Sequence, residues 1–426
     1  MNYTAETLKG GVRFVHVPMS SNPAVTSMVL INTGSEFESR EESGISHFLE
    51  HMLFKGTEKR PKGIDISREL DQIGASYNAF TSREYTGYYI KSAKVHFEKV
   101  TDVLADIVQH SLLRDEDIER ERGVILEEIN MYRDLPQEQV ADMFTSLVYG
   151  DTPAGRDVLG SKETVRSFTS THFHSYRKRH YIPEKTVVVV AGGVSYERAR
   201  NTVTALFAEY GKGRAFTKGA SKKKVKKFVP ESRVKITYKK TDQTHFVLGS
   251  TTCDRYHEDI WTLGVLSAVL DGGMSGRIFQ RIREELGAAY YASYGSSLCT
   301  DHGDWSLSAG VTNARTKEVL SASLEELVRV QRELVGPEEL KKAQEYLIGS
   351  LLLSLETSGA RARFYGFQSL FKESQMYTPD EMSKKINAVT AEDVQRVAKK
   401  YLKKTNMRLA LIGPHKDPTS FEKLLE

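Results

Sequence analysis

Two parts of the sequence, 221 residues apart, follow the same pattern of residue types. SFTSTHFHSYRKRHY (167–181) aligns with AVTAEDVQRVAKKYL (388–402), and the same shift places VVVVAGG (187–193) on RLALIGP (408–414). In each copy, a helix that begins after a threonine is predicted to lead into an apolar strand that ends at a glycine. The period is too long for a solenoid, so it indicates two tandem copies of one domain of roughly 200 residues.

The boundary between the copies is predicted at a lysine-rich segment. Eight basic residues and no acidic residue lie between Lys212 and Lys227, together with glycines and little apolar content. This composition is typical of a solvated linker. We therefore expect a first domain over 1–211, a linker over 212–231 that acts as a hinge, and a second domain over 232–426.

The same segment accounts for the basic character of the chain. The net charge is +4, and without these eight residues the rest of the chain carries −4. A nucleic-acid-binding face spread over a domain is therefore not expected. The lysine run alone is compatible with binding to an anionic surface, but its glycines and its place between the copies favour a solvated hinge.

Patterns within each copy predict an α+β fold. Alternating apolar runs predict strands at 11–17, 25–32, 84–91 and 232–238. Helical spacing of apolar residues predicts helices at 45–54, 95–109 and 115–132. The expected architecture is two tandem homologous domains, each with a mainly antiparallel sheet packed with helices.

Several features bear on the compartment. No apolar run reaches the roughly 18 residues that a membrane span needs, and the start of the chain lacks the apolar core of a signal peptide. Cys253 and Cys299 are too few for a disulfide framework and form no metal-binding pair motif. We expect a cytoplasmic protein that does not associate with membranes.

The most informative motif is His47-Phe48-Leu49-Glu50-His51. On a helix, His47 and His51 are four residues apart and share a face, so both imidazoles can reach one metal ion. Glu50 stands beside the same ion. This HxxEH order is the inverted form of the zinc peptidase motif HExxH. The alternative is a surface helix with a salt bridge between a glutamate and histidines.

A catalytic zinc needs a third protein ligand and one open position. The predicted helix ERERGVILEEINMY (119–132) carries Glu121 and Glu128 seven residues apart and therefore on one face, whereas Glu127 points elsewhere. Taken alone, this segment also fits an ordinary charged amphipathic helix.

These motifs resemble the pitrilysin and insulysin family of zinc peptidases over essentially the whole chain. The likeness is greatest to its short members, which include the beta subunit of mitochondrial processing peptidase and bacterial relatives. The family pairs HxxEH with a later segment like ERxVILxEI, which falls on 121–129 here. The resemblance implies that Glu128 is the third ligand of one zinc ion per chain and that Glu121 supports the metal site.

The resemblance also implies a substrate site. The family's Asn-Ala substrate strand matches Asn78 and Ala79, followed by Phe80, and its second-half segment REKxGLAY matches Arg283 and Tyr290 in REELGAAY. In the second copy, the helix that corresponds to the metal motif reads TLGVLSAVL, which carries no metal ligand. The second domain is therefore expected to lack a metal.

The implied activity is that of a zinc endopeptidase. Glu50 is expected to act as the general base, and Arg283 and Tyr290 are expected to hold the scissile carbonyl and the neighbouring backbone. Asn78 to Phe80 would bind a short or unfolded peptide as an added strand. Longer family members enclose substrate with four such domains, so a homodimer, or a heterodimer with a related chain, is expected here. The alternatives are a non-catalytic partner subunit and manganese in place of zinc.

Two other features of the sequence have residue types that occur in binding sites. His172, His174 and His180 align with Asp393, Gln395 and Tyr401 in the second copy, and His172 and His174 cannot share a helix face. We therefore expect a solvated helix rather than a metal site there. The glycine-rich segment LDGGMSGRIF (270–279) lacks the ending of a phosphate-binding loop, so no nucleotide is expected.

Overall fold

The computed structural model describes residues 3–211, 221–225, 228–371 and 376–426. These residues form two compact units. The first unit comprises residues 1–130, 157–223 and 353–378, and the second comprises 131–156, 224–352 and 379–426. Neither unit is contiguous in sequence, because each contains one segment from the other half of the chain.

The first unit is built on a sheet whose strands lie in the order β1-β2-β6-β3-β5-β4. Its strands are β1 (Thr4–Thr7), β2 (Arg13–Pro18), β3 (Ala24–Ile31), β4 (Ser76–Thr81), β5 (Thr86–Ala93) and β6 (Thr186–Gly192). Its helices are α1 (Ile45–Met52), α2 (Gly63–Asp71), α3 (Phe97–His110), α4 (Asp115–Asp134), α6 (Lys162–Ser167), α7 (Ser170–His180), α8 (Tyr196–Leu206) and α13 (Ser358–Phe371). The strand order places β4 at one edge.

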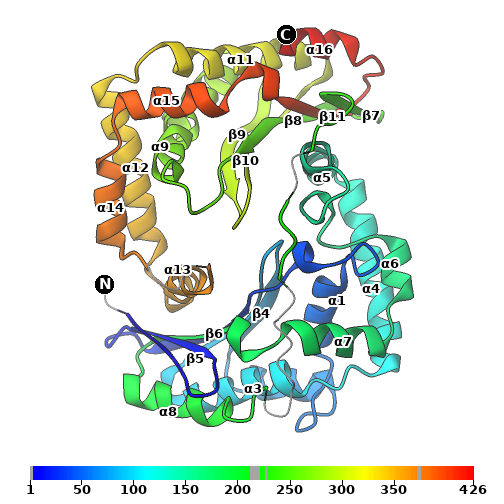
Figure 1. The fold of residues 1–426 in the computed structure, drawn as a ribbon, viewed down its shortest axis with the longest axis vertical. Helices are drawn as coiled ribbons and strands as arrows, with labels where there is room; N and C mark the ends of the chain where they lie inside the picture. Colours follow the sequence, from blue (N-terminus) through cyan, green and yellow to red (C-terminus); the bar gives the residue numbers. More distant parts are fainter. Residues whose placement is uncertain (1–2, 212–220, 226–227, 372–375) are drawn as a thin grey trace. The chain divides into compact units, whose positions relative to one another are not determined.

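Both faces of this sheet are covered by helices. In β3, Val25 and Val29 face the cluster that contains α1 and α3, whereas Met28 and Leu30 face the cluster that contains α13. This alternation is the period of two expected for a strand that is buried on both sides. Figure 1 shows α13 on one face of the sheet, with α3 and α8 on the other.

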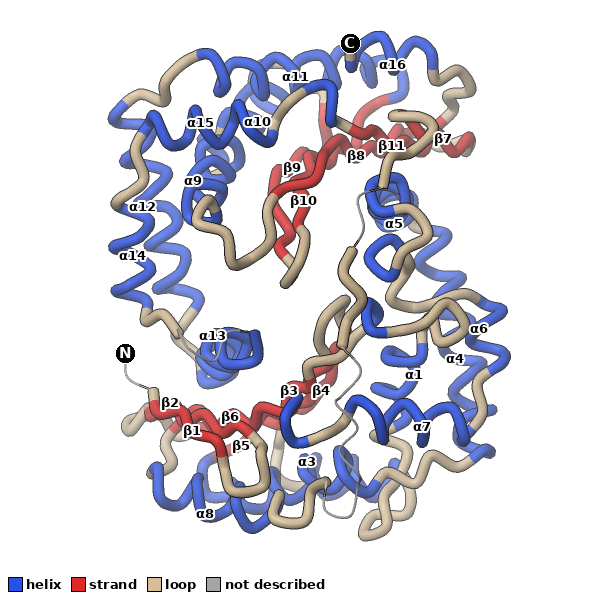
Figure 2. Tube along the Cα trace, in the orientation of Figure 1, coloured by secondary structure: helices blue, strands red, loops and turns tan. Residues whose placement is uncertain are grey.

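The second unit repeats this plan with the strand order β7-β11-β8-β10-β9. Its strands are β7 (Val234–Tyr238), β8 (Gln243–Thr252), β9 (Ala289–Leu298), β10 (Gly303–Thr312) and β11 (Arg408–Gly413). Its helices are α5 (Pro136–Tyr149), α9 (Ile260–Asp271), α10 (Arg277–Phe279), α11 (Thr316–Arg332), α12 (Pro337–Ser354), α14 (Pro379–Asn387), α15 (Ala391–Tyr401) and α16 (Thr419–Leu425). Figure 2 shows where the helices and strands of the two units lie along the chain trace.

The predicted duplication is confirmed by the two sheets. Each has one parallel pair, β2 with β6 and β7 with β11, and its other pairs are antiparallel. The bounds of α7 and α15 differ by the predicted shift of 221 residues, and a threonine stands at the N-cap of both helices. The α+β fold with tandem domains is therefore as expected.

The exchanged segments take equivalent places in the two units. Tyr365 of α13 is fully buried against β2, β3 and β6. In the second unit, Val140 and Phe144 of α5 pack on β8 and β11. Each exchanged helix thus covers a sheet face that would otherwise expose a row of valines, leucines and alanines to water.

Most of the predicted linker, residues 212–220 and 226–227, lies outside the described residues. At Lys222 the prediction of a solvated segment is wrong, because the side chain is only 8% exposed. Its ammonium group forms ion pairs with Glu36 and with Glu84, the latter at 2.9 Å. A buried ammonium group needs such partners, so Lys222 anchors this part of the segment to the first unit.

Over the described residues, no helix combines the length and the apolar character that crossing a bilayer requires.

Candidate metal centre

Helix α1 carries His47, Glu50 and His51 on the side that faces away from the core. Ile45, Phe48, Leu49 and Met52 are fully buried in the core of the first unit. These four positions follow helical spacing, so they fix the rotation of α1 about its axis. The remaining face presents His47, Glu50 and His51 towards β4 and α4.

Three side chains that could bind one metal ion converge at this face. Oε2 of Glu128, on α4, lies 3.7 Å from Nε2 of His47 and 3.8 Å from Nε2 of His51. One ligand atom from each of the three residues lies within 4.8 Å of the others. Around a tetrahedral zinc ion, with bonds of about 2.0 to 2.2 Å, the ligand atoms lie slightly closer to one another than these atoms do. The donor set therefore fits one zinc ion with a fourth position left open.

The electrostatics also suit a metal. Burial, together with the neighbouring His51, lowers the pKa of His47 to about 3, so this imidazole is neutral at physiological pH. A neutral imidazole can bind a cation without first losing a proton. Two imidazoles and one carboxylate form a donor set that zinc commonly takes in hydrolytic enzymes.

Glu121 lies behind the three side chains, two turns of α4 before Glu128. Nδ1 of His51 donates a hydrogen bond of 2.9 Å to Oε1 of Glu121, and Nζ of Lys55 lies 2.5 Å from Oε2. Burial raises the pKa of Glu121, but the hydrogen bonds from His51 and Lys55 outweigh it and leave the pKa below its ordinary value. Glu121 therefore stays charged and directs Nε2 of His51 towards Glu128.

Glu50 does not join the three ligands. Its Oε2 accepts a hydrogen bond of 2.5 Å from the hydroxyl of Thr81 in β4. Burial raises the pKa of Glu50, and the hydrogen bond from Thr81 opposes this effect. A carboxylate with a raised pKa is suited to accept a proton near neutral pH.

A cleft of about 240 Å³ lies beside these groups. It is lined by residues of α1 and its following turn, of β4 and of α4: Glu50, His51, Phe54, Lys55, Tyr77, Asn78, Ala79 and Glu121. Among the described strands, β4 pairs on one side only, with β5. The outer backbone edge of β4 therefore borders the cleft.

The substrate residues predicted on β4 lie on different faces of the strand. Ala79 lines the cleft, whereas the ring of Phe80 points to the opposite face, where it contacts Phe367 and lies under the guanidinium group of Arg363. Oδ1 of Asn78 accepts a hydrogen bond from the backbone of Ala79 at 2.8 Å. Phe80 pairs with Gly87 of β5, and a glycine makes room for the ring, because a Cβ at position 87 would lie 2.2 Å from it.

The other two predicted site residues belong to the second unit. Arg283 lies in a π-helical turn over the ring of Phe279, and Tyr290 near the start of β9 is 80% exposed. The structure therefore brings together His47, Glu50, His51, Glu121 and Glu128, next to β4 within one unit.

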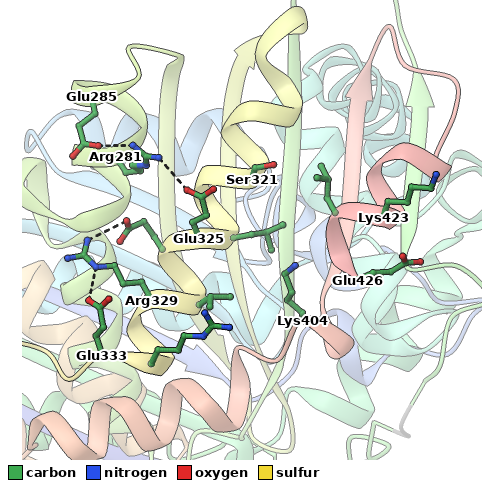
Figure 3. A pocket seen from close by; sticks show the side chains of 14 residues that line it. Arg281, Glu285, Ser321, Glu325, Arg329, Glu333, Lys404, Lys423 and Glu426 are labelled. Carbon is green, nitrogen blue, oxygen red and sulfur yellow. Dashed lines mark hydrogen bonds and ion pairs between the residues drawn. The ribbon is translucent and has the colours of Figure 1, made fainter.

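The second unit contains a larger groove, of about 980 Å³, lined in part by α11 and α16 (Figure 3). Several of its charges are paired within it: Arg281 with Glu285 and Glu325, and Arg329 with Glu333. Neither histidine nor cysteine is among its lining residues. The smaller cleft beside α1 is therefore the candidate site.

Sequence reasoning missed two residues of the site. Lys55 follows His51 by four residues, so its place near the same face was a usable signal. Thr81 follows Asn78 by three residues, and no local pattern marks it as a partner of Glu50. Only the packing of β4 against α1 brings Thr81 to that carboxylate.

Comparison with known proteins agrees with this geometry. The family model described as insulinase, peptidase family M16, matches residues 13–162, and the model described as peptidase M16 inactive domain matches residues 167–347. A relative from Bacillus subtilis, named as the uncharacterized zinc protease YmxG, is 38% identical over 96% of this chain and 97% of its own length. The chain belongs to peptidase family M16.

Other M16 relatives lead to the same assignment. A protein of Streptomyces coelicolor, also named as an uncharacterized zinc protease, is 36% identical over 96% of this chain and 89% of its own length. A solved protease from Helicobacter pylori aligns with a TM-score of 0.87 at 22% identity, covering 97% of this chain and 99% of that one. This structural likeness supports the M16 fold, and the predicted family resemblance is confirmed.

Proposed function

We propose that this chain is a zinc-dependent endopeptidase that hydrolyses short or unfolded peptides. The observation that carries the proposal is the convergence of His47, His51 and Glu128 beside Glu50, in a cleft bordered by the open edge of β4. Relatives named as zinc proteases support the same class of reaction.

The three ligands would hold one zinc ion per chain. When bound, zinc would polarise the peptide carbonyl and lower the pKa of a water molecule in its open position. Glu50 would take a proton from that water and deliver it to the leaving amine. Its carboxylate is half-buried and hydrogen-bonded to Thr81, which holds it in place.

The peptide would bind as an extended strand along β4. On its outer side β4 pairs with no other described strand, and an exposed sheet edge of this kind can recruit an extended peptide. Asn78, Ala79 and Phe80 would then flank the substrate backbone, with alternate substrate side chains on the two faces of the sheet. A folded protein segment could not add in this way, so the substrate must be short or unfolded.

Arg283 and Tyr290 would act on the substrate from the second domain. The exposure of Tyr290 leaves its hydroxyl accessible for a hydrogen bond to a carbonyl oxygen that gains charge. A homodimer would complete a closed chamber around the peptide. Each chain supplies two of the repeated domains, and two chains would supply the four with which longer family members enclose their substrate.

Cleavage of a quenched fluorescent peptide library tests the proposal. The purified protein should cleave peptides, lose activity with a chelator, and regain it when zinc is added back. Absence of cleavage at full zinc occupancy would contradict the proposal and favour a non-catalytic partner subunit. Co-purification would then identify the missing chain.

A further inference from the structure

The first turn of α1 has an unusual anchor. Gly44 occupies the N-cap position and has no side chain that could accept the free N–H groups at the start of the helix. The carboxyl group of Glu38 does so instead. Its Oε2 accepts the N–H of Gly44 at 2.8 Å, and its Oε1 accepts the N–H of Ser46 at 2.8 Å.

This carboxyl group is deeply buried. Glu38 is only 3% exposed, and burial raises its pKa to about 7 even though the hydroxyl and the N–H of Ser46 and the N–H of Gly44 donate to it. Burying such a group is costly unless its hydrogen bonds are satisfied. The N–H groups of the helix start meet that requirement, so carboxyl and helix hold each other in place.

A chain of hydroxyl groups continues from the anchor into the core. The hydroxyls of Ser46 and Tyr176 are hydrogen-bonded across 2.7 Å, and those of Tyr176 and Thr33 across 2.9 Å. Tyr176 lies on α7 and Thr33 just after β3, and all three residues are buried. The start of α1 is therefore tied to two separate elements of the first unit.

The backbone leading into α1 has no room to shift. Gly44 has a φ of +94°, and a Cβ there would lie 2.5 Å from the carbonyl oxygen of Leu159. The hydroxyl of Thr164 donates a hydrogen bond of 2.7 Å to the carbonyl oxygen of Ser43. The turn before α1 is thus held from both sides.

We propose that Glu38 is a positioning residue of the metal centre: by holding the amides of Gly44 and Ser46, it fixes the first turn of α1. Ser46 directly precedes His47, so any movement of this turn moves the first ligand at once and His51 one turn later. A metal site tolerates displacements of only about 0.5 Å. The inference rests on the proposed function.

Glu38→Gln tests this inference, with Glu58→Gln as the matched control, because Glu58 is exposed. The amide of glutamine turns an NH₂ group towards one of the two N–H donors, so one hydrogen bond is lost. Zinc affinity, measured by competition with a coloured chelator, should fall by about 10- to 100-fold, the range for losing a group that orients a metal ligand. At saturating zinc, kcat should fall while KM stays unchanged, because β4 is not altered. The control should match the wild type.

A folded Glu38→Gln protein with the zinc affinity of the wild type would overturn the inference and leave the proposed peptidase intact. Failure of the wild type itself to bind zinc would instead overturn the proposed function. If Glu38→Gln does not fold, Glu38→Asp replaces it under the same criterion, because the shorter side chain keeps the carboxyl but cannot reach both amides.

Discussion

The hydroxyl of Thr81 donates a hydrogen bond of 2.5 Å to Oε2 of Glu50. This contact joins the edge strand β4 to helix α1, two elements separated by α2 in the sequence. It places the proposed general base within reach of a peptide that adds to β4. In the proposed function, this one contact would therefore link the position of the base to the strand along which the peptide would bind.

Thr81→Val should lower kcat/KM by about 10-fold or more, because a hydrogen bond to a charged group contributes about 1.5 to 3 kcal/mol. Thr81→Ser keeps the hydroxyl and should retain most of the activity. Steady-state kinetics on one fluorogenic peptide compare the variants. Equal rates for Thr81→Val and the wild type would show that this hydrogen bond does not hold Glu50 for catalysis.

Glu50→Gln should abolish turnover and leave zinc bound, since the amide cannot accept a proton but does not disturb the three ligands. Metal analysis of the dialysed variant measures zinc, and the peptide assay measures turnover. If the variant lost its zinc, Glu50 would be a ligand, and the assignment of the base would be wrong.

Glu121→Gln should weaken zinc binding by about 10- to 100-fold, because His51 loses the carboxylate that orients its ring. Glu127→Gln is the control, since Glu127 is exposed on the same helix. Competition with a chelator measures both affinities. A result in which the two variants bind zinc equally well would remove Glu121 from the support of the metal site.

Tyr365→Ala should lower the free energy of unfolding by about 3 kcal/mol or more, the cost of removing a large buried aromatic side chain. Arg363→Ala on the same helix should cost about 1 kcal/mol or less, because Arg363 is exposed and its guanidinium group lies over the rings of Phe80 and Tyr89. Urea unfolding of the full chain measures both. Similar small losses would mean that α13 does not cover the first sheet.

His180 should make stability depend on pH. Burial, with the nearby charges of Lys185 and Arg179, lowers its pKa from 6.5 to about 3. Between these values the unfolded chain binds one more proton than the folded one. The stability that the folded chain gains from a neutral, buried His180 is therefore fully present above pH 6.5 and is lost as the pH falls towards 3.

The matching variant is His180→Phe, which keeps a ring to stack on Tyr176 but cannot titrate. From about pH 7 to about pH 5, the free energy of unfolding of the wild type should fall more steeply than that of the variant, by up to about 1.4 kcal/mol per pH unit. Urea unfolding at several pH values gives the two slopes. Parallel curves would contradict the pKa assigned to His180.

Much of the site could be read from local spacing. A helix places residues four apart on one face, so the spacing of His47 and His51 is enough to predict that both imidazoles can reach one metal ion. Glu121 and Glu128 follow the same rule on α4. The choice of Glu128 as ligand came from the family resemblance, and the structure places its carboxylate beside both histidines.

Other parts depend on contacts between residues far apart in sequence. Glu38 lies in a segment with no regular pattern, and its role emerges only where its carboxyl meets the N–H groups of α1. The lysine-rich segment predicts two halves that are each continuous in sequence. No local pattern indicates that α5 and α13 each cover a sheet built from the other half.

The sequence by itself determined the duplicated α+β fold and the faces on which the ligands stand, because these follow from the fixed periods of helix and strand. Tertiary structure decided which helix buries which sheet face, which hydroxyl meets Glu50 and which carboxyl anchors α1. Those choices depend on packing and hydrogen bonding between distant segments, where many residue types satisfy the same local pattern and only the folded chain selects one partner.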